Sequence, residues 1–317
     1  MSILFAGPSA LDALRQTRCD NSYHQLCPVS AKGQRKAPEL WEIDHAQRFL
    51  SNRIVDLVVE VSADRCRLPR KQVQYIVDSA PKPRNAVLSL DRHISLPSPE
   101  LLFLQMHRFL SDTECIALGM ELCGTYARQA SDAIAYHLPP CTSKSKIQKF
   151  LNHLTPRYCL ARAKRNIELV HDNSCSLRES QLALILSLPP RLGGYGFEHP
   201  ILNRPFDVSS AVEQRRGNDT RWVDISWPAA KLAVEYDSNE FHSGTAKIQH
   251  DASRRTLLQA TGVEVIVVTN SQLKSIHELD LVAKAIARAL GKRQRCSIKD
   301  YEKRKRELHR TVLSLDF

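Results

Sequence analysis

The stretch LAVEYDSNEFH, residues 232–242, decides how the second half of this chain folds. Its first six residues are mostly apolar, which predicts a buried β-strand. Side chains alternate between the two faces of a strand, so Glu235 and Asp237 share one face. Two carboxylates at that spacing repel each other, and a fold tolerates them where a cation lies between them or where a sheet edge is exposed. The neighbouring strand decides between these arrangements.

The segment WVDISW, residues 222–227, predicts that neighbouring strand. The connection through residues 228–230 is short enough to place the two strands side by side. Asp224 then lies near Glu235, and their carboxylates converge. Convergent carboxylates on a rigid sheet form a hard-oxygen site suited to Mg²⁺ or Mn²⁺. The competing interpretation is that Asp224 is a turn residue at a strand end.

The segments around these two strands predict an α/β domain. Ser176 is expected to cap a helix that ends at Pro189, with Glu179 as its capping-box partner. The near-continuous apolar run of residues 263–269 predicts a strand that is buried on both faces. Helices are predicted over residues 245–262 and 271–291. The order helix, strand pair, helix, strand, helix indicates a mixed sheet flanked by helices.

The first part of the chain is expected to be mainly helical. The apolar residues after Ser98 are spaced so that they would form one buried helix face, and Ser111 is positioned to cap a second helix. Residues 146–154 predict a further amphipathic helix. Arg157, Arg162, Lys164 and Arg165 then follow close together. Such a basic turn rests on a phosphate backbone or forms a solvated helix face, and both interpretations stay open here.

The net charge favours a polyanionic partner. The 317 residues carry a formal charge of +11 with a pI near 9.3, and cations that neutralise phosphates release condensed counterions. Nucleic acid is the first expectation and an acidic membrane the second. The nine cysteines form no CxxC pair, which indicates reduced thiols and a cytoplasmic protein. No segment reaches the ~18 apolar residues of a membrane span, so we expect no membrane partner.

Several of these residues together resemble a known family. Asp224, the Glu235-x-Asp237 pair, His242, Asp251 with Arg254 and the strand VIVVT are similar in order to the PD-(D/E)xK nuclease superfamily, in the branch built like very-short-patch repair endonucleases. The resemblance covers residues 175–290 and implies a restriction-endonuclease-like fold. Residues 98–127 also resemble the helical N-terminal regions of bacterial proteins related to abortive-infection and toxin–antitoxin components.

The resemblance implies roles for individual side chains. Asp224 and Glu235 are expected to bind the metal, and Glu179 is expected to be a further ligand or to orient the attacking water. Asp237 stands where the superfamily has lysine, so it either ligates or acts as a base. His242 would supply the missing acid–base group. Glu179 as a helix-capping residue and His242 as an ordinary loop residue remain the alternatives.

Basic side chains are expected to hold the nucleic acid. Asp251, Arg254 and Arg255 share one helix face, where Arg254 either neutralises the reacting phosphate or forms an ion pair within the helix. Between residues 288 and 310, ten Lys and Arg stand against three acids, which predicts a basic tail or helix. The residues expected to bind nucleic acid are Arg215, Arg216, Arg221, Arg255, Lys292 and Arg293.

The sequence therefore predicts three parts and one activity. Residues 1–170 form a mainly helical domain that contacts DNA or a partner, residues 171–292 form the nuclease-like domain, and residues 293–317 form the basic C-terminal tail or helix. The expected activity is Mg²⁺- or Mn²⁺-dependent endonuclease cleavage, with DNA as substrate, in repair or phage defence. The alternative is a non-catalytic nucleic-acid-binding or antitoxin-like regulator on the same scaffold. A homodimer stays open.

Overall fold

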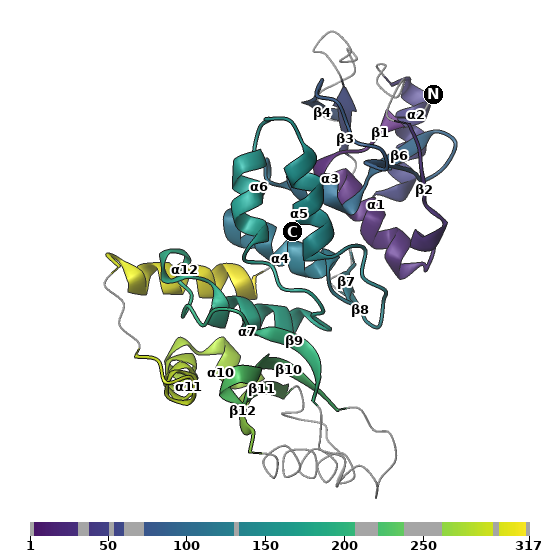
Figure 1. Ribbon diagram of the computed structural model, residues 1–317. Helices are drawn as coiled ribbons and strands as arrows, with labels where there is room; N and C mark the ends of the chain where they lie inside the picture. Colours follow the sequence, from purple (N-terminus) through teal and green to yellow (C-terminus); the bar gives the residue numbers. More distant parts are fainter. Residues whose placement is uncertain are drawn as a thin grey trace, which may run out of the picture. The chain divides into compact units, whose positions relative to one another are not determined.

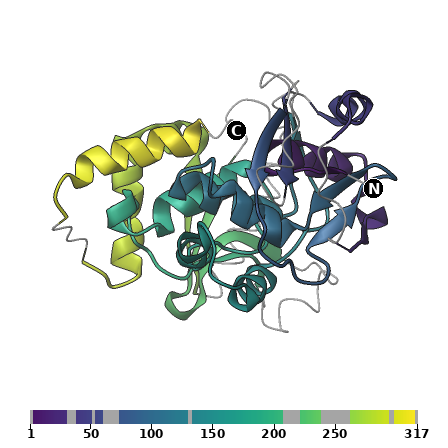
Figure 2. The same ribbon diagram turned by 90° about the horizontal axis from the view of Figure 1, so that it is seen from above.

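The chain folds into two units, residues 1–170 and 171–317, and each is described by itself. The structure is a computed structural model, shown in Figure 1 and from above in Figure 2. It describes residues 3–30, 38–50, 54–59, 73–129, 133–206, 221–237, 262–293 and 298–314. Among these residues, no helix combines the length and the apolar character needed to cross a membrane.

Unit 1 combines short strands with helices. One sheet has the order β1-β6-β5-β2, and two further strand pairs are β3–β4, which is parallel, and β7–β8, which is antiparallel. Its strands are β1 (Ile3–Leu4), β2 (Cys27–Pro28), β3 (Val55–Val59), β4 (Val73–Val77), β5 (Val87–Ser89), β6 (Ile94–Pro97), β7 (Ala127–Arg128) and β8 (Ile134–Ala135). Its α-helices are α1 (Gly7–Cys19), α2 (Leu40–Ala46), α3 (Pro99–Met106), α4 (Asp112–Leu122), α5 (Lys144–His153) and α6 (Leu160–Ile167).

The domain over residues 1–170 was expected to be mainly helical. Its described residues before position 98 form six strands besides α1 and α2, so this part is mixed and the expectation is wrong for it. The runs VDLVV in β3 and VQYIV in β4 are too short for periodicity to separate a strand from a helix segment, although their β-branched residues favour strands. One of the unit's core clusters joins these strands, since Leu4, Val58, Ile76 and Val87 are all buried in it.

The predicted helix starts after residue 97 are confirmed. The side chain of Ser98 accepts a hydrogen bond from the backbone N–H of Leu101, and Pro99 occupies the first position of α3. Ser111 and Glu114 form a reciprocal capping box at the start of α4. These caps satisfy N–H groups that a helix leaves without an internal partner, which explains why the two starts are legible in the sequence.

The described residues of unit 2 form a four-stranded mixed sheet of order β12-β11-β10-β9. The strand β10 runs antiparallel to both β9 and β11, whereas β11 and β12 are parallel. The helix α7 packs against β10 and β11 on one side and against α12 on the other (Figure 1). The elements are α7 (Leu177–Ser187), β9 (Ile201–Phe206), β10 (Arg221–Trp227), β11 (Leu232–Asp237), β12 (Glu264–Thr269), α10 (Asn270–Lys274), α11 (Ile276–Ala289) and α12 (Tyr301–Leu313).

The two predicted strands and the strand after them form, but β12 is mostly half-buried at the edge of the described sheet and is not buried on both faces as predicted. The flanking elements differ in two places. The helix predicted over residues 271–291 is two helices, because Ser275 leaves the helical conformation and its side chain caps α11 by accepting from the N–H of Glu278. The strand β9 was not predicted, since the sequence around it has no clear alternation. The helix predicted over residues 245–262 lies, except for its last residue, outside the described residues.

The C-terminal helix α12 is part of unit 2. A Cβ atom at Gly193, whose φ is +92°, would lie 2.3 Å from the carbonyl oxygen of Arg304, so only glycine permits this close approach. The hydroxyl of Tyr301 donates to the carbonyl oxygen of Gly194 at 3.1 Å. Lys305 is 6% exposed and binds Asp280 at 2.8 Å. The basic segment is thus a packed helix over residues 301–313.

Candidate functional site

The two predicted acids Asp224 and Glu235 lie on the paired strands β10 and β11. The register of these strands pairs Ile225 with Val234, and its continuation by one residue places Asp224 opposite Glu235. The backbone N–H of Tyr236 donates to Oδ2 of Asp224 at 2.7 Å. Because that nitrogen is roughly 2.4 Å from the Cα atom of Glu235, the Asp224 carboxylate lies within about 5 Å of the Glu235 backbone. Asp224 therefore turns toward the strand that carries Glu235.

Asn203 of β9 lies next to Asp224 in the strand register. The strand β10 pairs Val223 with Arg204 and Ile225 with Leu202, so Asp224 and Asn203 stand between these two pairs. Asn203 has a φ of +44°, in the left-handed region that asparagine tolerates better than most residues. The backbone of β9 is therefore irregular at the position beside Asp224.

Glu179 lies at the start of α7 and holds three donors. Its carboxylate accepts from the backbone N–H of Cys175 at 2.9 Å, from the hydroxyl of Ser176 at 3.1 Å and from the side-chain amide of Asn203 at 2.7 Å. Glu179 therefore fastens the beginning of α7 to β9. This supports its role in stabilising the helix start, and its role as a metal ligand stays a prediction.

Asn203 is a site residue that the sequence analysis missed. It lies on β9 opposite Asp224 in the strand register and bonds to Glu179, so it connects the helix start to the acidic pair. The only available signal was an asparagine inside a strand-forming stretch, because asparagine is depleted in strands and enriched at left-handed positions.

Glu235 and Asp237 occupy the C-terminal half of β11. Glu235 is 9% exposed and pairs with Val267 of β12, whereas Asp237 is half-buried and pairs with Thr269 at the strand end. In the part of the chain that the structure describes, no three His, Cys, Asp or Glu side chains are grouped to hold a metal ion. Mg²⁺, however, uses one or two carboxylates and completes its six positions with waters and substrate phosphates. The oxygen donors of Asp224 and Glu235 fit that requirement.

The remaining predicted residues are distributed as follows. His242, Arg254, Arg255, Arg215 and Arg216 lie outside the described residues. Arg221 is the first residue of β10. Lys292 and Arg293 are exposed and follow the last turn of α11. The structure therefore places Asp224 near the backbone of Glu235 and bonds Glu179 to Asn203, and the roles of all the predicted site residues stay predictions.

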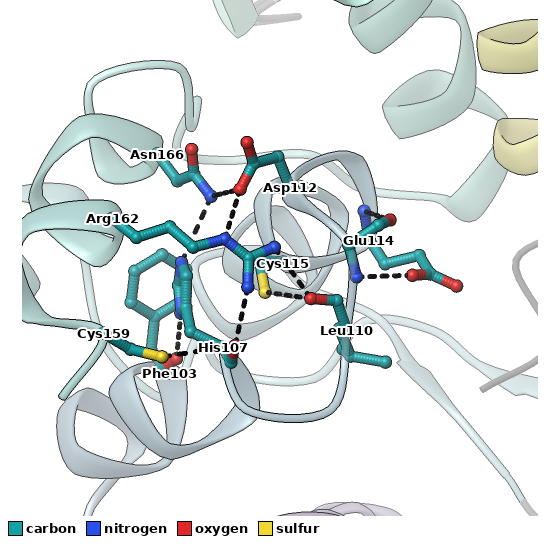
Figure 3. Close-up of polar contacts among 10 residues, drawn as sticks. Phe103, His107, Leu110, Asp112, Glu114, Cys115, Cys159, Arg162 and Asn166 are labelled. Carbon is teal, nitrogen blue, oxygen red and sulfur yellow. Dashed lines mark hydrogen bonds and ion pairs between the residues drawn. The ribbon is translucent and has the colours of Figure 1, made fainter.

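The basic turn in unit 1 is structural at Arg162. Its guanidinium donates to the carboxylate of Asp112 at 2.5 Å and to the carbonyl oxygens of His107 and Leu110 at 2.6 and 2.8 Å. Figure 3 shows these partners around the guanidinium. These bonds join α6 to the turn between α3 and α4. The interpretation of a phosphate-binding turn is therefore wrong for Arg162, because its donors face the protein.

The same cluster contains Cys159, His107 and Asn166, residue types that also occur in nucleophilic sites. The ring of His107 is 2% exposed, and burial lowers its pKa to about 4. The neutral ring therefore donates from Nδ1 to the carbonyl oxygen of Phe103 at 2.7 Å and accepts at Nε2 from Asn166 at 3.2 Å. The thiol of Cys159 points to the main-chain oxygen of His107. A nucleophile needs its base within hydrogen-bond reach, so this cluster is a structural network (Figure 3).

Comparison with known proteins supplies relatives but no activity. No family model and no solved structure matches this chain. Two uncharacterized proteins of Mycobacterium tuberculosis, from two strains, are each 25% identical to it over 150 residues. The match covers 47% of this chain and 50% of each relative. The chain thus spans about half the length of the curated relatives it matches.

Proposed function

We propose that unit 2 is a metal-dependent endonuclease that hydrolyses phosphodiester bonds of DNA. The observation that carries the proposal is the 2.7 Å bond from the N–H of Tyr236 to Asp224, which holds this carboxylate beside the buried Glu235. The order of the acidic residues along the chain resembles the nuclease superfamily described above. The net charge of +11 suits a nucleic-acid substrate.

Each side chain has a defined part in this proposal. Asp224 and Glu235 would hold Mg²⁺ or Mn²⁺ with carboxylate oxygens fixed on two paired strands. The bound ion would lower the pKa of a water and offset charge on the phosphate. Asp237, at the end of β11 where the superfamily has lysine, would orient that water or accept its proton. Glu179 and Asn203 would keep the start of α7 in place beside the acidic pair.

Two predicted residues outside the described part complete the proposed chemistry. Arg254 would neutralise the charge that develops on the phosphate, since its guanidinium presents several donors to one anion. His242 would exchange a proton with the reacting groups near neutral pH. Both assignments rest on the resemblance alone, and substitution of either residue tests them separately.

The test compares two Glu-to-Gln variants on adjacent strands. The full chain is incubated with supercoiled plasmid and with single-stranded DNA in Mg²⁺ or Mn²⁺. Glu235→Gln should lower the cleavage rate by about 10²- to 10³-fold, the usual effect of losing one group that stabilises transition-state charge. Glu264→Gln is the matched control, because Glu264 is exposed at the start of β12, and it should retain wild-type cleavage.

The same experiment separates the enzyme from its alternative. A wild-type chain that cleaves neither substrate with either ion contradicts the proposal. DNA binding in a gel shift that survives in Glu235→Gln would then favour the non-catalytic regulator, whose sequence support is the aspartate at position 237 in place of lysine.

A further inference from the structure

The positive charge of this protein is concentrated at its C-terminal end. Residues 288–310 hold ten Lys and Arg against three Asp and Glu, a net charge of +7 out of the chain's +11. A charge of this density over a short segment either surrounds itself with water and ions or faces a polyanion. The packing of α12 shows how that charge is presented.

One face of α12 packs against the rest of unit 2. Leu308 and Val312 are buried, and the ring of His309 contacts the carbonyl oxygen of Leu273 at 2.9 Å. Lys305 lies on the same side and is held by Asp280 and Glu302 at 2.8 and 3.0 Å. The ammonium of Lys305 is therefore used inside the protein. The helix has a fixed rotation about its axis, so its opposite face is also fixed.

The opposite face presents a row of arginine and lysine side chains. Lys303, Arg306 and Arg310 follow each other at i, i+3 and i+7, which places them on one stripe. All three are exposed, and no ion pair joins them to any residue that the structure describes. Glu307 is the one acid on this stripe. We call Lys303, Arg306, Glu307 and Arg310 the basic face of α12.

The basic face belongs to a helix that adjoins the candidate site. The side-chain amide of Gln181 donates to the carbonyl oxygen of Val312 at 2.9 Å, so the C-terminal end of α12 lies against the first turns of α7. Glu179 is on the first turn of α7 and bonds to Asn203, which lies opposite Asp224. Figure 1 shows α12 along α7 on the side away from the sheet. The helix is about 18 Å long, enough to follow several phosphates.

We propose that the basic face of α12 binds the phosphate backbone of DNA and so holds the substrate on unit 2. Rigid cations that replace condensed counterions supply sequence-independent affinity. The inference rests on the proposed function, since it names how the substrate is held. Its test measures binding without metal, so its outcome does not depend on cleavage.

The experiment uses fluorescence anisotropy of a labelled DNA duplex with the full chain in EDTA over a series of salt concentrations. Arg306→Gln with Arg310→Gln should reduce the slope of log affinity against log salt by about two, because each lost phosphate contact removes about one. Affinity at 0.1 M salt should fall at least about tenfold. The matched control, Lys274→Gln with Arg288→Gln, removes two exposed cations from the last turns of α10 and α11 and should leave the slope unchanged.

A variant that should strengthen DNA binding separates a loss of phosphate contacts from a loss of folding, because a misfolded protein would not bind more tightly. Glu307→Gln removes the one acid of the basic face and should tighten DNA binding severalfold. Equal losses in the Arg306/Arg310 variant and in its control would overturn the inference, as would a wild-type chain that binds phosphatidylserine vesicles but not the duplex. Cleavage that persists unchanged in the Arg306/Arg310 variant would overturn it too, while leaving the proposed function intact.

Discussion

The two units each bury a glutamate, and its surroundings differ. In unit 1, Glu121 is 2% exposed and lies between Arg15, which binds it with two bonds at 2.8 and 2.7 Å, and Arg128 at 3.2 Å. In unit 2, Glu235 is 9% exposed and its neighbour across the sheet is Asp224. Glu121 is stabilised by cations from within its own unit. In the proposed function, Asp224 and Glu235 would instead share a cation supplied from solution.

Two arginines of unit 1 differ in the same way from two arginines of α12. Arg18 is 4% exposed and donates to four backbone carbonyl oxygens. Arg162 likewise donates hydrogen bonds to backbone carbonyl oxygens of the turn between α3 and α4. By contrast, Arg306 and Arg310 of α12 are exposed. Both units bury charged residues, so burial by itself does not separate a structural charge from a functional one. The partner that neutralises the charge does.

The largest expected effect tests this comparison directly through stability. Glu121→Gln leaves two buried arginines without their carboxylate and should destabilise unit 1 by about 3–5 kcal/mol. Glu235→Gln removes one of two adjacent acids and should leave the stability of unit 2 unchanged or slightly higher. Urea unfolding with hydrogen-exchange mass spectrometry assigns each effect to its unit. Equal destabilisation by both substitutions would break the comparison.

The pH dependence of unit 1 should show two separate steps. The two arginines hold the pKa of Glu121 near about 2 against burial, which acts to raise it, so its stabilisation is complete above about pH 4.5 and is lost as pH falls toward 2. His107 has a pKa lowered to about 4 by burial, so stability also falls as pH drops from about 6.5 to 4. Each step corresponds to about 3 kcal/mol.

Variants assign these two steps. His107→Gln should remove the dependence between pH 6.5 and 4, and Glu121→Gln should remove the dependence below pH 4.5. Urea midpoints measured at half-unit pH intervals provide the readout. A His107→Gln protein that keeps the upper step would show that another group causes it.

A smaller effect is expected at the turn between α3 and α4. Arg162→Lys keeps the positive charge but loses the planar fork that reaches Asp112, His107 and Leu110 together. It should cost about 1–2 kcal/mol of unit 1 stability. Arg165→Lys, at an exposed position on the same helix, is the control and should change stability little. A loss of DNA affinity in Arg162→Lys without a loss of stability would restore the phosphate-binding interpretation.

The smallest expected effect comes from the metal. At ten times its dissociation constant, Mg²⁺ or Mn²⁺ should stabilise unit 2 of the wild-type chain by about 1.4 kcal/mol. Glu235→Gln should abolish this increase, and Glu264→Gln should keep it. Thermal unfolding with and without EDTA measures both. A stabilisation that is the same in all three proteins would place the bound ion elsewhere.

Local sequence rules recovered the elements of unit 2 that carry the acidic pair. The strands β10, β11 and β12 and the helix α7 form where apolar runs, capping residues and prolines predicted them. The short connection of residues 228–230 also allowed the sequence to predict that Asp224 and Glu235 lie on neighbouring strands. These features could be predicted from the sequence because they depend on residues that are close together in the chain.

Other features depend on partners far away in the chain and were missed. The strands β1 and β2 have only two residues each and pair with β6 and β5, more than 50 residues away, so no local pattern distinguished them. The conformation of Asn203 follows from its bonds to Asn173 and Glu179, 30 and 24 residues away. Arg162 reads as a surface cation until its contacts with Asp112 and His107, 50 and 55 residues away, are known.

The sequence by itself determined which residues are acids on adjacent strands and where the positive charge collects, because strand parity and composition are local properties. Only the tertiary structure decided which charges are neutralised inside the fold. Lys305 forms an ion pair with Asp280, whereas Arg306, the next residue, is exposed. This difference follows from the rotation of α12 about its axis where it packs against α7. Neutralisation of a charge requires a partner in space, and the chain brings such partners together only when it folds.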